Sequence, residues 1–297
     1  MTTTVSPAVV RRPVVARTRA ELSFALEKVR AGGGRVGLVP TMGALHEGHR
    51  ALIGTARGLV GESGAVVVSV FVNPLQFGQG EDLSRYPRTF EDDLEICAAE
   101  GVDVVFAPAV GEVYPDGEPQ VTIEPGPRGA ILEGSSRPTH FRGVLTVVAK
   151  LLGLVRPDMA VFGQKDYQQL VLIRQMVHDL SMGVEIFGAE TVRETEGLAL
   201  SSRNKYLDAD QRVLALLLSR ALRAGAEVGR LGAGQVLAAA RDVLQSADPL
   251  GQVAVDYLEL TSPDLGEVPE RGDARLLVAA RVGPTRLIDN TALVLGQ

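Results

Sequence analysis

The chain has 297 residues, of which 45% are hydrophobic and 22% charged, and its formal net charge is −6. This length allows one large domain or two modest ones, and the composition is typical of a soluble globular protein. The negative charge argues against nucleic acid as a partner, the longest apolar runs are too short to span a membrane, and we expect no signal peptide. A single cysteine, Cys97, excludes an internal disulfide and fits a reducing cytoplasm.

Residues 1–12 are predicted to be a loose tail. A helix is expected over residues 18–30, because Thr18 and Glu21 have the spacing of a capping box and the apolar residues form one stripe. A strand over residues 36–39 follows. Pro40 is expected to end this strand, since proline cannot donate a hydrogen bond within a central ladder.

Two histidines, His46 and His49, follow the next turn, where a second helix is expected to start. Three residues apart on a helix, they lie about 60° apart and can reach one ligand. Three interpretations are open: ordinary solvated or hydrogen-bonded histidines, metal ligands, or donors to nucleotide phosphates during phosphoryl or nucleotidyl transfer. The phosphate interpretation is favoured, because a helix start attracts anions and only His140 and His178 remain as further histidine ligands.

The pattern continues as alternating strands and helices. The nearly unbroken apolar run at residues 65–72 favours a parallel sheet covered on both faces. The further expected elements are a helix over 89–100 capped by Thr89 and Asp92, a strand over 102–106, a short strand over 121–124, a buried helix over 144–155, a strand over 159–162, a helix over 167–180 with Leu180 on its core face, and a strand over 184–187.

After residue 190 the order of elements changes. Two helices are expected near residues 209–230 and 234–246, followed by strands near 253–260, 275–282 and 285–295. Helices followed by consecutive strands suggest a small α+β domain. We therefore predict two domains, 1–190 and 191–297.

Several polar residues occupy positions where open α/β sheets bind ligands, directly after strands. Gln76 lies in the loop after the strand at 65–72, and Lys165 follows the strand at 159–162 and a glycine, as a phosphate-binding lysine would. Asp166 suits either a helix cap or a ligand to a metal or hydroxyl. The donor cluster at residues 201–204 suits either a mobile phosphate clamp or a capped turn.

Six motifs together resemble the pantoate–β-alanine ligase (pantothenate synthetase) family of the HxGH nucleotidyltransferase superfamily. They are PTMGALHEGH (40–49), FVNPLQF (71–77), YPRTFEDDL (86–94), RPTHFRGV (137–144), KDYQQL (165–170) and LSSRNKYLD (200–208). The resemblance implies an α/β fold with a Rossmann-like parallel-sheet N-terminal domain, a smaller α+β C-terminal lid domain, and a cytoplasmic homodimer. It also implies that ATP and pantoate, with Mg²⁺, give pantoyl adenylate and pyrophosphate, and that β-alanine then displaces AMP to give pantothenate for coenzyme A synthesis.

Matched by position, the resemblance assigns roles to individual residues. The catalytic residues holding the ATP phosphates would be His46, His49, Lys165, Ser201 and Arg203. The implied ATP-binding set is Pro40, Met42, Gly43, His46, His49, Gly163, Lys165, Asp166, Val192, Leu200, Ser201, Ser202 and Arg203. Pantoate would contact Met42, Gln76 and Gln169. Asp92 or Asp93 matches the magnesium-linked acidic position, and Arg137 and His140 would have a supporting or gating role.

The chain departs from the family pattern at two positions: Leu200 stands where methionine is common, and Gln164 where an acidic residue is frequent. Two other functions are alternatives. A different adenylyltransferase would use the paired histidines without needing β-alanine, but it would leave Gln76 and Gln169 unexplained. A nucleotide-binding regulatory protein that has lost catalysis would not be expected to keep the whole phosphate-binding set.

Overall fold

The computed structural model describes residues 12–78, 83, 86–246, 248 and 251–296. Its contacts divide the chain into two compact units. The N-terminal unit comprises Met1–Glu124, Thr139–Phe162 and Met176–Ala189, and the C-terminal unit comprises Pro125–Pro138, Gly163–Gln175 and Glu190–Gln297. The two-domain division at residue 190 stays a prediction. Apart from Arg12, the predicted loose tail lies outside the described residues.

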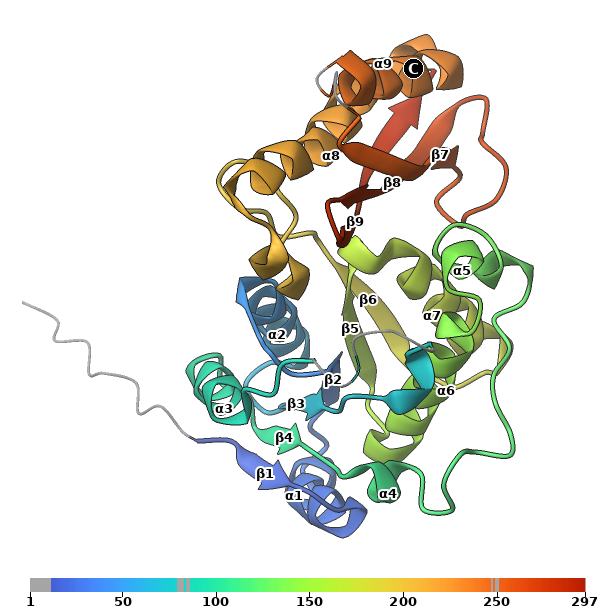
Figure 1. Ribbon diagram of the computed structural model, residues 1–297. Helices are drawn as coiled ribbons and strands as arrows, with labels where there is room; N and C mark the ends of the chain where they lie inside the picture. The colour runs from blue at the N-terminus through green and yellow to red at the C-terminus, as the bar shows by residue number, and fades with distance from the viewer. Residues whose placement is uncertain (1–11, 79–82, 84–85, 247, 249–250, 297) are drawn as a thin grey trace, which may run out of the picture. The chain divides into compact units, whose positions relative to one another are not determined.

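A six-stranded sheet forms the centre of the N-terminal unit (Figure 1). Its strands are β1 (Val14–Ala16), β2 (Val36–Thr41), β3 (Ala65–Val70), β4 (Val104–Phe106), β5 (Met159–Gly163) and β6 (Glu185–Ala189). They lie in the order β1-β4-β3-β2-β5-β6, and the pairs β1–β4, β4–β3, β3–β2 and β2–β5 are parallel. The predicted parallel α/β fold is confirmed. The three-residue β1 was not predicted.

Helices cover both faces of this sheet (Figure 1). Helices α2 (Glu47–Val60) and α3 (Phe90–Ala99) pack on one face, where Val66 and Val68 of β3 are buried. Helices α1 (Arg19–Ala31) and α6 (His140–Val155) lie against the other. Among the described residues of the first half, further helical segments include the short α4 (Val110–Val113) and the 3₁₀ turn η1 (Pro74–Gln76).

The expected caps and core faces are partly corrected. Thr18 forms the predicted capping box at α1. At α3, however, Thr89 makes no side-chain cap, because its hydroxyl instead donates to Asp93 Oδ1 at 3.3 Å. Leu180 is 55% exposed, since α7 (Tyr167–Asp179) ends one residue earlier. Residues 121–124 form no strand, because their backbone is irregular and Val121 faces solvent.

Pro40 does not end its strand as predicted but lies inside β2, paired with Ser69 of β3. The carbonyl of Thr41 accepts from the Phe71 N–H, so alternation along the strand turns the backbone nitrogen of Pro40 to the opposite edge, towards β5. The residues of β2 that pair with β5 are Gly37 and Leu38. The ladder on that side therefore stops before a proline N–H would be needed.

The order of the strands indicates which edge of the sheet is the candidate ligand-binding edge. From β2 the chain first adds β3 and β4 on one side, and later adds β5 and β6 on the other. In open α/β sheets ligands bind where the order reverses, at the carboxyl ends of the strands. The turn after β2, which carries both candidate histidines, lies at this edge.

The C-terminal unit contains a three-stranded antiparallel sheet of β7 (Val253–Thr261), β8 (Gly272–Val282) and β9 (Thr285–Leu295). Helices α8 (Ala209–Glu227) and α9 (Ala233–Ser246) pack on one face, where Leu276 and Val278 are buried. On the other face Leu277 packs against Tyr167 and Val171 at the start of α7. This second contact explains why residues 163–175 belong to the C-terminal unit.

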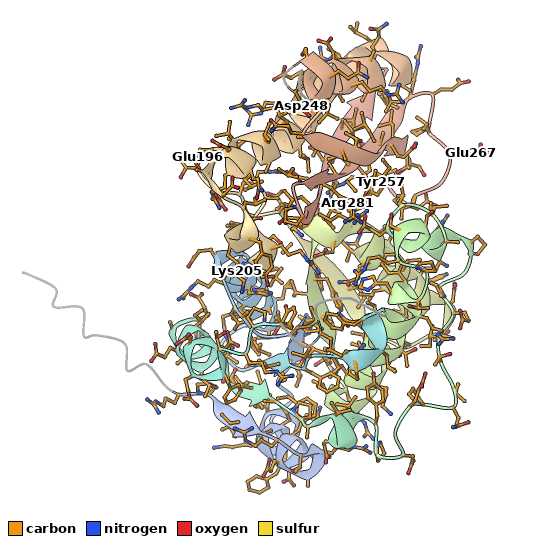
Figure 2. The ribbon with its side chains drawn as sticks, viewed as in Figure 1. Glu196, Lys205, Asp248, Tyr257, Glu267 and Arg281 are labelled. Atoms are coloured by element: carbon orange, nitrogen blue, oxygen red, sulfur yellow. The ribbon has the colours of Figure 1, made fainter. Side chains whose placement is uncertain are left out.

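A half-buried polar cluster joins α5 (Glu133–Ser136) to the same sheet. Arg286 binds both carboxylate oxygens of Glu133 at 2.6 and 2.8 Å. The hydroxyl of Tyr257, which is labelled in Figure 2, donates to Glu133 Oε1 at 2.9 Å. Burial, together with the adjacent Glu133 carboxylate, raises the pKa of the Tyr257 phenol. The described residues of this unit include the 3₁₀ turns η3 (Pro127–Gly129), η4 (Gln164–Asp166), η5 (Ser202–Tyr206) and η6 (Gly229–Leu231). Within the described residues, the helices are too short or too polar to cross a membrane.

Cys97 lies in the core between α3 and the sheet and is 0% exposed. Burial, with a smaller contribution from Asp93, raises the pKa of its thiol to about 12 from an ordinary value of 9.0. We expect the native protein to react with a disulfide reagent at pH 8 only through transient opening. As the pH rises above 9, the thiol ionises in the unfolded chain before it ionises in the native protein. We therefore expect the contribution of Cys97 to the free energy of unfolding to be constant below pH 9 and to fall between pH 9 and 12.

Denaturation at several pH values, compared with Cys97→Ala, measures this contribution free of other titrating groups. Identical pH dependence of the two proteins, or rapid modification of the native thiol, would contradict it.

Candidate active site

The turn between β2 and α2 is held by a buried carboxylate. Asp93, on α3, is 2% exposed and accepts hydrogen bonds from the Ala44 N–H at 3.1 Å and the Leu45 N–H at 2.8 Å, through different oxygens. Thr89 adds the hydroxyl contact to Oδ1. The carboxylate therefore satisfies two backbone donors that would otherwise be unpaired next to the core.

The same turn uses a left-handed backbone conformation at two successive residues, with φ of 82° at Gly43 and 52° at Ala44. A Cβ added to Gly43 would stand 2.9 Å from Asp93 Oδ2 and 3.1 Å from Val70 Cγ1. Glycine is thus required at residue 43 for space as well as for conformation. Ala44 bears the cost of a positive φ, which its hydrogen bond to Asp93 helps to offset.

The two candidate histidines form the cap of α2. His46 is the N-cap, and its Nδ1 accepts from the Gly48 N–H at 3.1 Å, while His49 Nδ1 accepts from the His46 N–H at 3.2 Å. Their ring centroids are 4.2 Å apart, with 47° between the planes. This reciprocal capping arrangement fixes both imidazoles on the first turn of the helix.

Such capping also determines which nitrogen carries the proton. A ring whose Nδ1 accepts a hydrogen bond carries its hydrogen on Nε2. His46 and His49 therefore present Nε2–H donors, beside the positive end of the α2 dipole. Both features suit a phosphate.

Met42 and Gln76, two of the residues predicted to contact pantoate, lie together at the same edge of the N-terminal unit. Gln76 Nε2 donates to Met42 Sδ at 3.0 Å, and the Gln76 backbone carbonyl is 3.0 Å from His140 Nδ1. Asn73 fixes the Gln76 amide by donating to its Oε1 at 3.2 Å. Because Tyr114 donates to Asn73 Oδ1 at 2.9 Å, the Asn73 amide is itself oriented.

Helix α6 packs closely enough to hold this loop. Asn73 also donates to the carbonyl of Gly143, at 3.1 Å. A Cβ on Gly143 would lie 2.2 Å from the Leu75 carbonyl oxygen, so only glycine permits the approach. The supporting role predicted for the motif around His140 is thus consistent with the packing on Gln76.

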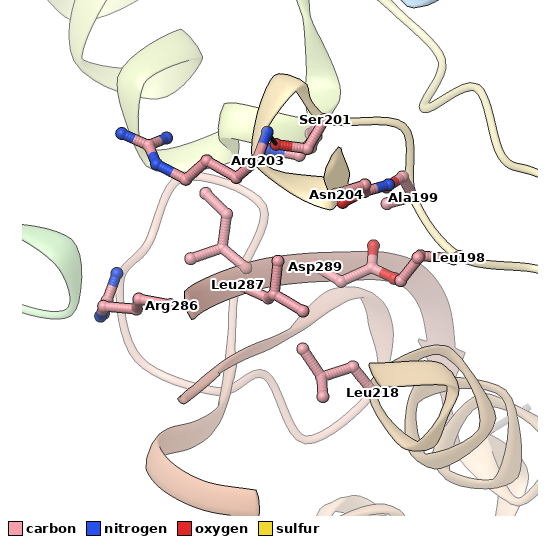
Figure 3. A pocket seen from close by; sticks show the side chains of 11 residues that line it. Leu198, Ala199, Ser201, Arg203, Asn204, Leu218, Arg286, Leu287 and Asp289 are labelled. Atoms are coloured by element: carbon pink, nitrogen blue, oxygen red, sulfur yellow. Dashed lines mark hydrogen bonds between the residues drawn. The ribbon is translucent and has the colours of Figure 1, made fainter. Parts of the chain in front are cut away.

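A second set of predicted phosphate-binding residues lies in the C-terminal unit. Lys165, Ser201 and Arg203 are among the residues that line a small pocket of about 30 Å³. Figure 3 shows Ser201 and Arg203 on one side of it, and Arg286 and Asp289 on the other. Lys165 is on the turn η4, where its Nζ lies 3.8 Å from Asp166 Oδ1. Polar and apolar side chains both line the pocket, which has room for water-sized groups but not for a nucleotide.

The loop before η5 positions Ser201 and Arg203. Leu200 N–H donates to the Val192 carbonyl at 2.9 Å, in a short two-stranded pairing that also joins Arg193 to Ala199. Ser201 Oγ then accepts from the Arg203 N–H at 3.2 Å and caps η5. The capped-turn interpretation of residues 201–204 is correct at this point, which does not exclude phosphate binding.

Two buried polar residues, Asp289 and Asn204, also line this pocket. Asp289, 4% exposed, binds the Arg193 guanidinium through both oxygens at 2.6 and 2.9 Å. Asn204, 5% exposed, donates to Glu194 and to the Ala199 carbonyl, and its own Oδ1 has no hydrogen-bond partner among the described residues. Sequence reasoning missed Asp289, because it sits in an ordinary strand with no motif around it.

The structure groups the predicted site residues by unit. Pro40, Met42, Gly43, His46, His49 and Gln76 are in the N-terminal unit, and Gly163, Lys165, Asp166, Gln169, Val192, Leu200, Ser201, Ser202 and Arg203 are in the C-terminal unit. Gln169 is half-buried on α7, and Asp166 is exposed. The roles of these residues stay predictions.

Asp92 and Asp93, predicted near magnesium, have different surroundings. Asp92 is exposed, whereas both oxygens of Asp93 already accept hydrogen bonds from the protein. Across the part of the chain that the structure describes, no group of three or more His, Cys, Asp or Glu side chains is arranged to hold a metal ion. Metal binding by either residue stays a prediction, and the structure assigns Asp93 a structural role.

Comparisons with known proteins agree with the geometry. A family model described as pantoate-beta-alanine ligase matches residues 14–292. The chain is 64% identical to a pantothenate synthetase of a Nocardioides species, over 96% of this chain and 86% of that protein. A crystal structure of the pantothenate synthetase from Thermus thermophilus is similar, with a TM-score of 0.85, 46% identity, and coverage of 94% of this chain and 98% of that one.

A crystal structure of the pantoate-beta-alanine ligase from Francisella tularensis is also similar, with a TM-score of 0.74 and 34% identity over 94% of this chain and 97% of that one. That enzyme was solved in complex with beta-gamma ATP and beta-alanine.

Replacement of Asp93 tests the clamp on the turn. Asp93→Ala would leave the Ala44 and Leu45 N–H groups buried and unpaired, so we expect the free energy of unfolding to fall by about 2–4 kcal/mol. Asp92→Ala, at an exposed neighbour, is expected to change it by less than about 0.5 kcal/mol. Urea denaturation with and without Mg²⁺ measures both. A loss that appears only with Mg²⁺ would indicate a metal ligand instead of a clamp.

Proposed function

Because this chain belongs to the pantoate–beta-alanine ligase family, we propose that it joins pantoate to β-alanine using ATP and releases AMP and pyrophosphate. The observation that carries the proposal is the pair of imidazoles capping α2, whose Nε2–H groups point away from the backbone donors that bind Nδ1. Two fixed donors at a helix start suit the phosphates of a nucleotide. Binding of ATP and β-alanine by the Francisella enzyme supports the same substrates here.

The first proposed step forms an acyl adenylate. A carboxylate oxygen of pantoate attacks the α-phosphorus of ATP, an O–P bond forms, and the bond to the β-phosphate oxygen breaks to release pyrophosphate. Pantoate is already ionised, so no protein base is required. Catalysis then depends on positioning and on donors that stabilise charge on the phosphates, the role we propose for His46, His49, Lys165, Ser201 and Arg203.

In the second proposed step the neutral amine of β-alanine attacks the acyl carbon. A C–N bond forms, the C–O bond to AMP breaks, the amine loses a proton, and pantothenate is left. An acyl adenylate reacts with water, so exclusion of water between the steps would raise the yield of the amide.

For pantoate we propose Met42, Gln76 and Gln169 as contacts. The Gln76 amide is a donor held by Asn73 and can bind a carboxylate or a hydroxyl, while Met42 offers an adaptable apolar surface beside it. An amide leaves the pantoate carboxylate unprotonated and nucleophilic. These contacts support Gln76, while Gln169, half-buried on α7, is proposed from the family resemblance.

We propose that Mg²⁺ enters with ATP as part of the substrate. The described residues contain no three-ligand group, and Mg²⁺ commonly retains its waters and binds substrate phosphates with few protein carboxylates. In that complex it supplies neutralisation of phosphate charge. The family resemblance also supports the proposals that the enzyme is cytoplasmic and works as a homodimer.

A product assay with ATP, Mg²⁺ and pantoate, with and without β-alanine, tests the reaction. We expect pantothenate and AMP in equal amounts only when all three substrates are present, and pantoate-dependent exchange of pyrophosphate into ATP without β-alanine. ADP in place of AMP would indicate an acyl phosphate and contradict the adenylate route. AMP formation that never requires β-alanine would favour a different adenylyltransferase, and ATP binding without turnover would favour a regulatory protein.

Single substitutions test the phosphate donors. We expect His49→Ala and Lys165→Ala to remain folded and to slow pyrophosphate exchange by about 100-fold, the usual effect of removing one donor to developing charge. The exposed residues His178 and Lys28 provide matched controls as His178→Ala and Lys28→Ala, both expected to keep wild-type rates. A wild-type rate in either site variant would exclude that residue from the chemistry.

A further inference from the structure

Asn290, in the middle of β9, uses its whole side-chain amide to hold a turn of another segment. It is 3% exposed, and its Nδ2 donates to two consecutive backbone carbonyls, those of Gln164 at 3.0 Å and Lys165 at 2.9 Å. These carbonyls belong to η4, a turn of only three residues with no side-chain cap of its own. Both hydrogens of one amide therefore fix the backbone from which the Lys165 side chain projects.

Arg275, on the neighbouring strand β8, determines which way the Asn290 amide faces. Its Nε donates to Asn290 Oδ1 at 2.8 Å, and its Nη2 donates to the same oxygen and to Gln164 Oε1, the latter at 3.2 Å. A guanidinium has only donors, so it must face the amide oxygen. The amide nitrogen is consequently directed at the two carbonyls of η4.

The guanidinium of Arg275 is itself held in place. It is 7% exposed and stacks over the Tyr167 ring, with Cζ 4.0 Å from the ring centroid. Burial lowers the pKa of Arg275, with smaller opposing contributions from Tyr167 and Asp289. Placing an arginine in these surroundings is expensive, and a hydrophobic residue would fill the same space at lower cost. The cost is understandable if the cation performs a task at this position.

We propose that Asn290 and Arg275 are positioning residues, which act through the backbone of η4 to aim Lys165 into the pocket shared with Ser201 and Arg203. The inference rests on the proposed role of Lys165 in binding nucleotide phosphates. Neither residue touches the nucleotide. Asn290 sets the position of the Lys165 ammonium group, and Arg275 sets the orientation of the Asn290 amide.

A merely structural role makes a different prediction. If Asn290 only joined β9 to η4, its loss would lower the stability of the C-terminal unit and leave nucleotide binding unaltered in the folded protein. Asp248 provides the matched case (Figure 2). It is 8% exposed in the same unit and also satisfies two backbone groups, the Gln252 N–H at 2.9 Å and the Val253 N–H at 2.7 Å. It makes no such contact with η4 among the described residues.

The experiment measures binding of β,γ-methylene ATP by isothermal titration calorimetry to the full chain and its variants. The variants are Asn290→Ala, Lys165→Ala, the double variant, and the control Asp248→Ala, each checked for folding by thermal denaturation. Asn290→Asp is a second probe. It keeps the size of the side chain and a partner for Arg275, but it replaces the two donors with an oxygen that repels the carbonyls of η4.

We expect Asn290→Ala and Asn290→Asp to weaken binding about 10- to 100-fold, since small misplacement of a positioned group has effects of this size. We expect the double variant to bind no more than about threefold more weakly than Lys165→Ala alone. Once the Lys165 side chain has been removed, loss of the residue that positions it has little further effect on binding. Asp248→Ala should lower the melting temperature yet bind the analogue as the wild type does.

Multiplying effects in the double variant, or wild-type binding by folded Asn290→Asp, would overturn the proposal. Wild-type binding by Lys165→Ala would also overturn it, since Lys165 would then make no contribution to nucleotide binding that Asn290 could control. The product assay remains a separate test. A wild type that makes no pantothenate but shows the coupling in binding would refute the proposed reaction and leave the positioning of Lys165 supported.

Discussion

The hydrogen bonds from the Ala44 and Leu45 N–H groups to the buried carboxylate of Asp93 are the contact on which the N-terminal site depends. They hold a turn with two successive positive φ angles, and that turn sets where α2 begins. Because α2 is capped by His46 and His49 themselves, the position of the turn is also the position of both imidazoles. An acidic side chain on one helix thus determines where the two imidazoles at the start of another helix lie.

The C-terminal unit uses the same method with a different side chain. Asn290 holds two carbonyls of η4, as Asp93 holds two N–H groups of the turn after β2. In both places a short irregular segment that carries candidate ligand-binding residues is fixed by one buried polar residue from an adjacent regular element. Loops placed in this way can keep backbone conformations that local propensity disfavours, while their functional side chains stay accessible.

Much of the fold was predictable because each element is encoded locally, by apolar periodicity, capping pairs and glycine or proline boundaries. One error occurred where a distant partner decides the outcome: Pro40 continues its strand because β5 pairs with β2 only up to Leu38. Others are local, such as Thr89, whose hydroxyl donates to Asp93 four residues later and does not cap α3. For the site, contiguous motifs indicated the histidines and Lys165. Asn290 and Arg275 lie alone in strands of ordinary sequence, and their significance follows only from contacts across more than 100 residues.

Those long separations also have a consequence for the order in which the protein is made. The partners of Asn290 precede it by 126 and 125 residues, so a chain leaving the ribosome exposes η4 long before β9 exists. The turn after β2 needs Asp93 only 49 residues later, and it can close while synthesis continues. A nascent chain therefore acquires its histidine pair first and its fixed lysine last.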